Sequence, residues 1–121
     1  MSFYEVETWV PKPDQKINHD KMIRTWFSFV KTHQEDLFPE WRSAQYYREV
    51  ERNSGETTGR YIMVFEYVSH EGFLAYKARR KTWSGPYAEY KTVDPYQFFD
   101  LSTVTETYWM PEETGRWLDF T

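Results

Sequence analysis

Two glutamates close to the amino terminus have the type and spacing that acid–base chemistry needs. The stretch from Ser2 to Val10 alternates in a strand-like pattern, with Glu5, Glu7 and Trp9 on one face. If that face is withdrawn from water, burial raises the pKa of Glu7, which can then act as a catalytic general base. The alternative is that the glutamates are solvated charges on an edge strand.

His70 is the second candidate for catalysis. It follows Glu66 by four residues, where a strand is predicted to end and a helix to begin. An imidazole here can shuttle a proton, or bind a metal together with Glu66. A helix amino terminus disfavours a charged histidine, however, and the other histidines supply no third ligand at a suitable spacing. An ordinary surface or capping histidine is therefore the alternative, and we predict no metal site.

Four basic residues lie together near the end of the predicted second helix: Lys77, Arg79, Arg80 and Lys81. They suit an acidic or phosphorylated ligand, but basic residues in a last helical turn also stabilise the helix dipole. The chain has no glycine-rich phosphate loop, no nucleophile elbow and no paired-histidine motif. We therefore predict no cofactor.

Aromatic side chains are unusually frequent, since Phe, Tyr and Trp make up 25 of the 121 residues. Rings with polar edges favour an organic ligand in a concave site. The same rings are also typical of a core and of a dimer interface. The residues predicted to line a ligand pocket are Trp9, Tyr47, Tyr61, Tyr87 and Trp109.

The overall composition narrows the classes of partner. The chain has 15 basic and 19 acidic residues, and its net charge of -4 opposes binding to nucleic acid. Its longest strongly apolar run, Tyr61 to Phe65, is too short to cross a membrane, and Glu5 and Glu7 are unlike a signal peptide. The absence of cysteine fits a reducing compartment. We therefore expect a cytoplasmic protein that binds neither nucleic acid nor membrane.

The periodicity of the sequence predicts four strands and two main helices in the order βαββαβ. The predicted strands are 2–10, 43–51, 60–68 and 103–110. One helix follows Asn18 for about four turns, a second covers 70–82 with Ser69 as its cap, and a short helix is expected near 87–91. The strand at 60–68 is apolar on both faces, so it should lie inside the sheet.

We expect one α+β domain covering residues 1–121. Within it, residues 84–102 form an aromatic insertion and residues 111–121 form a tail. The order of the elements places the four strands in one antiparallel sheet with two helices on one face. The opposite face would then expose apolar residues, and a second copy of the chain is the simplest cover.

This element order, from Phe3 to about Met110, resembles the ferredoxin-like subunit of the dimeric α+β barrel superfamily, which includes cofactor-free monooxygenases, isomerases and uncharacterised proteins. The resemblance implies a homodimer with a pocket between sheet and helices or within the barrel. We favour a protein that binds a small organic ligand. The alternatives are a cofactor-free enzyme of the same fold, with Glu7 or His70 as base, and a structural or stress-related assembly protein.

Overall fold

The computed structural model describes all residues, 1–121, and contains one four-stranded sheet covered by helices. In chain order the elements are β1 Phe3–Pro11, α1 Lys16–Leu37, β2 Trp41–Val50, β3 Thr57–Tyr67, α2 His70–Arg80, α3 Tyr87–Val93, the 3-10 helix η1 Pro95–Phe98 and β4 Phe99–Trp109.

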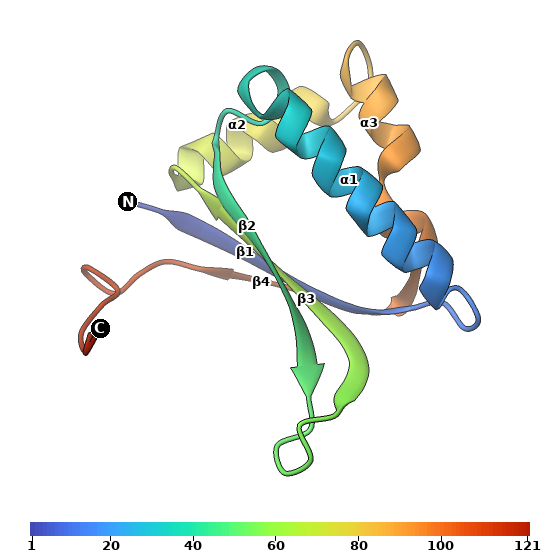
Figure 1. Cartoon of the computed structure of the whole chain (residues 1–121). Coiled ribbons are helices and arrows are strands. Elements are labelled where there is room, and N and C mark those ends of the chain that lie inside the picture. Colours follow the sequence, from blue (N-terminus) through green and yellow to red (C-terminus); the bar gives the residue numbers. More distant parts are fainter.

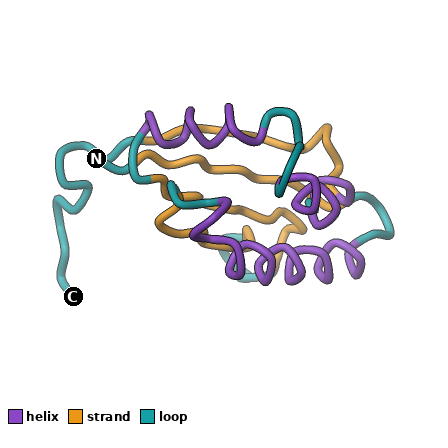
Figure 2. The backbone as a smooth tube through the Cα atoms, turned by 90° about the horizontal axis from the view of Figure 1, so that it is seen from above, coloured by secondary structure: helices purple, strands orange, loops and turns teal.

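The sheet is antiparallel throughout, with the strand order β2-β3-β1-β4. The predicted ferredoxin-like α+β fold is therefore confirmed, and β3 lies inside the sheet as expected. Figure 1 shows all helices on one side of the sheet. In Figure 2, α1 and α2 run along opposite margins, and α3 from the aromatic insertion lies between them at one end. The insertion thus closes the layer of helices over the sheet.

Several boundaries differ from those that the sequence predicts. Helix α1 begins at Lys16, and Asn18 is not its cap: the Asn18 side chain donates to Gln15 Oε1 at 2.9 Å. The helix also continues to Leu37, well beyond the expected four turns. Strand β4 begins at Phe99 instead of Thr103. The Ser69 cap is confirmed, because its hydroxyl accepts a hydrogen bond from the Gly72 amide at 2.9 Å.

The core between sheet and helices is built mainly from aromatic rings. Large buried side chains include Trp9 on β1, Trp26 on α1, Phe38 directly after α1, Trp41 at the start of β2, and Tyr67 on β3. Burying such rings contributes the largest share of the hydrophobic stabilisation available to a small domain. No helix is long and apolar enough to cross a membrane.

Candidate functional site

A cavity of about 260 Å³ lies between the helix-covered face of the sheet and the helices. Strands β1 and β3 contribute Glu5, Glu7, Trp9, Met63, Phe65 and Tyr67 to its wall. The helices α1, α2, α3 and η1 contribute Ile23, Trp26, Tyr76, Arg80, Tyr90 and Tyr96. An apolar cavity with a few polar groups is the usual form of a site for a small molecule.

Glu7 is the most perturbed carboxyl group of this cavity. Glu7 is only 8% exposed, and its Oε2 is hydrogen-bonded to the Tyr96 hydroxyl. Burial raises the pKa of Glu7 to about 8, and the neighbouring carboxylates of Glu106 and Glu5 act in the same direction. Glu7 therefore holds a proton at neutral pH and can give or take one close to that pH.

The idea that Glu5 and Glu7 are solvated charges on an edge strand is wrong. Strand β1 lies between β3 and β4, and both side chains are buried under the helices. Both carboxyl oxygens of Glu5 have a polar partner: Oε1 accepts a hydrogen bond from the Tyr67 hydroxyl at 3.1 Å, and Oε2 is 3.6 Å from Lys77 Nζ. A buried charge of this kind needs such a partner.

Two buried polar atoms of the cavity wall have no hydrogen-bond partner: Trp41 Nε1 and the Tyr76 hydroxyl oxygen. Tyr76 is only 1% exposed. Buried polar groups are nearly always hydrogen-bonded, and leaving one unsatisfied costs roughly 1–3 kcal/mol. Nearby, the Arg80 guanidinium stacks over the rings of Tyr76 at 5.2 Å and Trp83 at 5.1 Å. The wall of the cavity thus includes two residues with an unpartnered polar atom and one cation.

Trp9, one wall of the cavity, is held by a buried polar chain. Its Nε1 donates to His19 Nε2 at 2.8 Å, and its ring stacks on Phe99 at 4.2 Å between centroids. His19 Nδ1 lies 2.9 Å from Asp20 Oδ1, which also accepts from the Tyr61 hydroxyl at 2.9 Å. Burial lowers the pKa of His19, so it is neutral and its Nε2 can accept from Trp9.

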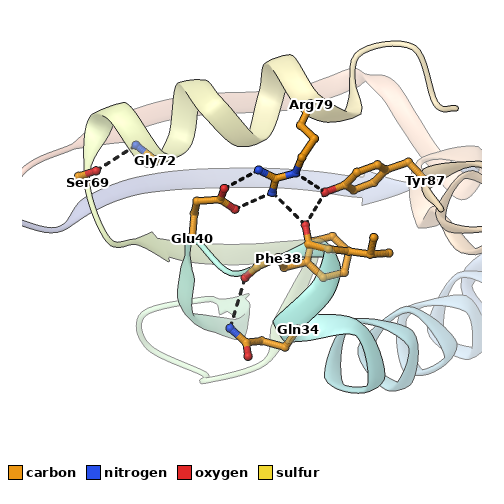
Figure 3. Close-up of polar contacts among 8 residues, drawn as sticks. Gln34, Phe38, Glu40, Ser69, Gly72, Arg79 and Tyr87 are labelled. Atoms are coloured by element: carbon orange, nitrogen blue, oxygen red, sulfur yellow. Dashed lines mark hydrogen bonds and ion pairs between the residues drawn. The ribbon is translucent and has the colours of Figure 1, made fainter. Parts of the chain in front are cut away.

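Arg79 fixes helix α2 to α3 and to the connection between α1 and β2, as Figure 3 shows. Its guanidinium makes two bonds to Glu40, at 2.6 and 2.7 Å, and donates to the Tyr87 hydroxyl at 2.9 Å and to the Leu37 carbonyl at 3.2 Å. The four basic residues of α2 and its end therefore do not act as one anion site. Arg79 is structural, Lys77 pairs with Glu5, and only Arg80 and Lys77 line the cavity.

The structure brings only part of the predicted site together. Glu7 and Trp9 line the cavity. Tyr61 is buried beside Trp9, and Tyr87 is buried on α3 where its hydroxyl donates to the Leu37 carbonyl, but neither lines the cavity. The remaining candidates lie elsewhere.

His70 is exposed at the start of α2, and its ring lies 5.0 Å from that of Phe3, outside the cavity lining. Glu66, its suggested partner in a metal site, accepts hydrogen bonds from Ser2 and Ser43. Tyr47 and Trp109 are 51% and 55% exposed on the helix-free face of the sheet. Their registers place them there, opposite Ile62 and Tyr4 respectively.

Glu106, Trp41 and Tyr76 were not predicted from the sequence as site residues. Glu106 lies directly opposite Glu7 across β1 and β4. That pairing depends on the register of two strands nearly a hundred residues apart, with an irregularity between Thr8 and Val10. The alternation of β4 could have shown that Glu106 and Tyr108 share a face. It could not have shown which residue they oppose.

Neither a protein-family model nor a curated protein matches this sequence. The fold is nevertheless found in solved structures. A protein from Arabidopsis thaliana is 15% identical with a TM-score of 0.62, over 90% of this chain and 94% of its own. SnoaB, a cofactor-independent oxygenase from Streptomyces nogalater, is 12% identical with a TM-score of 0.56, over 92% and 93%. A dimeric ferredoxin-like protein of unknown function from Thermobifida fusca is 11% identical with a TM-score of 0.59, over 90% of both chains. The chain shares the fold of these proteins.

Proposed function

We propose that this protein binds a small planar organic molecule, bearing a hydroxyl or carbonyl substituent, in the cavity between sheet and helices. The observation that supports this most directly is the pair of unpartnered polar atoms, Trp41 Nε1 and the Tyr76 hydroxyl, that belong to residues of a wall rich in aromatic rings. Aromatic walls favour a flat ligand, and the free N–H and O–H groups favour one that carries an oxygen acceptor.

A second function, cofactor-free catalysis by proton transfer, is favoured by Glu7. Its carboxyl group faces the cavity with a pKa of about 8, raised mainly by burial. Efficient general acid–base groups have pKa values near the working pH. A bound molecule with an acidic O–H or C–H bond beside Glu7 would meet such a group. His70 has no part in this proposal, because it lies outside the cavity lining.

Binding can be tested with 2-naphthol, a flat hydroxylated probe that should quench the tryptophan fluorescence of the cavity wall. Tyr76→Phe keeps the ring and removes the free hydroxyl, so 2-naphthol should bind roughly two- to tenfold more weakly. Naphthalene, which lacks the hydroxyl group, should bind equally well to both proteins. Stability should not fall, since Tyr76→Phe removes an unsatisfied buried group.

Tyr87→Phe is the matched control. Tyr87 is also a buried helical tyrosine, but its hydroxyl is engaged by Leu37 and Arg79 and lies outside the cavity lining. This variant should lose stability and bind 2-naphthol normally. Quenching that does not saturate, or that is the same in the Tyr76→Phe variant as in the wild type, contradicts the proposed site.

We also propose that the functional unit is a homodimer formed through the helix-free face of the sheet. That face carries Tyr4, Val6, Ile62 and Val64 at its centre, with exposed Tyr47 and Trp109 beside them. Apolar side chains gathered on one uncovered sheet face are typical of an interface. Two solved structures of this fold are described as dimeric, which supports a homodimer.

A further inference from the structure

The Glu7 carboxyl group is connected to the exposed residue Glu106 by hydrogen bonds through Tyr96, and both of these partners belong to the cavity lining. The Tyr96 hydroxyl contacts Glu7 Oε2 on one side and lies 3.0 Å from Glu106 Oε1 on the other. The three groups come from β1, η1 and β4. Solvent exposure increases along this series of hydrogen-bonded groups. Glu7 is buried, Tyr96 is 36% exposed, and Glu106 is exposed.

We propose that Glu7, Tyr96 and Glu106 form a proton relay between the cavity and solvent. The inference rests on the proposed function, since it concerns the proton of a molecule bound in the cavity. A flat ligand would displace water from around Glu7, and a proton taken from that ligand would then need another exit. The contacts through Tyr96 supply one.

The resting protonation states provide a proton donor at Glu7 and an ionised acceptor at Glu106, and the order of the two pKa values makes the return of the proton from Glu106 to Glu7 the downhill direction. Burial raises the pKa of Glu7, whereas hydrogen bonds with Glu7, Tyr96 and Tyr108 hold the pKa of Glu106 below its ordinary value despite partial burial. The Tyr96 hydroxyl can donate to either carboxylate. While Glu7 is protonated, its carboxyl proton can be donated to the Tyr96 oxygen, and Tyr96 then donates to ionised Glu106. The other charged groups nearby are Glu5, which raises the pKa of Glu7, and Lys77, which favours ionised Glu106.

The proton transfer needs no other reactant, because each proton that leaves one group is taken up by the next. The proton of Glu7 passes to the Tyr96 oxygen while the original hydroxyl proton of Tyr96 passes to Glu106, so the tyrosine stays neutral. Glu106 releases that proton to water. Glu7 is left as a carboxylate and takes a proton from an O–H or acidic C–H bond of the ligand, which keeps the electron pair. The reverse sequence returns a proton to the ligand.

The relay can be tested by a pH jump on protein loaded with 2-naphthol, followed by the infrared absorption of the protonated Glu7 carboxyl group. Tyr96→Phe should slow the loss of this signal roughly tenfold or more, as removal of a proton-transfer group does. Tyr108→Phe is the matched control, because Tyr108 also donates to Glu106, at 3.2 Å, but does not bond to Glu7. It should respond like the wild type. Equal rates in the Tyr96→Phe variant and the wild type overturn the relay.

Two further measurements test the relay if the Tyr96→Phe variant does not fold or if 2-naphthol does not bind. Should Tyr96→Phe fold poorly, Glu106→Gln removes the terminal acceptor at an exposed position and should slow the signal in the same way; an unchanged rate overturns the relay.

Failure of 2-naphthol to bind contradicts the proposed function alone. The relay can then be tested in the protein without ligand by NMR. The chemical shift of the Glu106 carboxyl carbon should show a second step at the pH at which Glu7 loses its proton. This step should disappear in Tyr96→Phe and remain in Tyr108→Phe; its persistence in Tyr96→Phe overturns the relay.

Discussion

The chemical character of Glu7 comes from its surroundings, since an isolated glutamate titrates far below neutral pH. Its strand passes under the helices, where burial disfavours the charged form and raises its pKa from 4.5 to about 8. Between these two values the folded protein binds one more proton than the unfolded chain. The free energy of unfolding must therefore fall as the pH rises through this range, by up to about 1.4 kcal/mol per pH unit.

Glu7→Gln should remove this dependence, because glutamine keeps the shape and cannot ionise. The variant should be more stable than the wild type near pH 8 and should lose that advantage below about pH 4.5, where Glu7 is protonated in both states. Urea unfolding across this pH range measures the difference. Glu89→Gln, on the exposed surface of α3, is the control and should follow the wild type. A parallel pH profile for Glu7→Gln and the wild type would show that Glu7 is solvated.

At the scale of elements, the polar contacts of Arg79 join α2 to α3 and to the connection between α1 and β2. Lysine cannot make the paired bonds to Glu40 or reach the other two acceptors at once. Arg79→Lys should therefore lower the free energy of unfolding by roughly 1–3 kcal/mol. Arg116→Lys, in a solvent-exposed ion pair of the tail, should cost less than about 0.5 kcal/mol. Chemical denaturation measures both, and equal small effects would contradict the structural role of Arg79.

The elements were predictable where local periodicity decides them. The apolar spacing of Ile23 and Trp26 and the hydroxyl of Ser69 identified two helices correctly, and the two apolar faces of β3 placed it inside the sheet. The cavity was not predictable in the same way. Trp41 and Tyr76 come together only after β2 and α2 pack, with ring centroids 5.3 Å apart. Such contacts depend on strand register and helix position, which a single sequence does not reveal.

The aromatic insertion, residues 84–102, was difficult to predict from the sequence and supplies a residue of the proposed relay. Residues 84–102 follow no long period, so the sequence indicated only a turn and a short helix. In the fold, α3 and η1 from this segment cover one end of the sheet and bring Tyr96 to Glu7 and Glu106. The segment that periodicity described least therefore supplies the central group of the proposed relay.

For the molecule as a whole, the helix-free face of the sheet decides the state of association. The helices cover one face, whereas the other exposes Tyr47 and Trp109 beside Tyr4, Ile62 and Val64. A second copy would bury both patches symmetrically. Light scattering at micromolar concentration should give twice the mass of the chain.

Trp109→Asp should convert that dimer into a folded monomer. Trp109 is 55% exposed in the single chain, so its replacement removes little intramolecular packing, while an aspartate at the interface would be buried without a partner. Leu74→Asp is the matched control, because Leu74 is similarly exposed but lies on α2, on the opposite side of the sheet. It should leave the dimer intact. A wild-type monomer would contradict the dimer outright, and a dimer that survives Trp109→Asp unchanged would place the interface elsewhere than on this face.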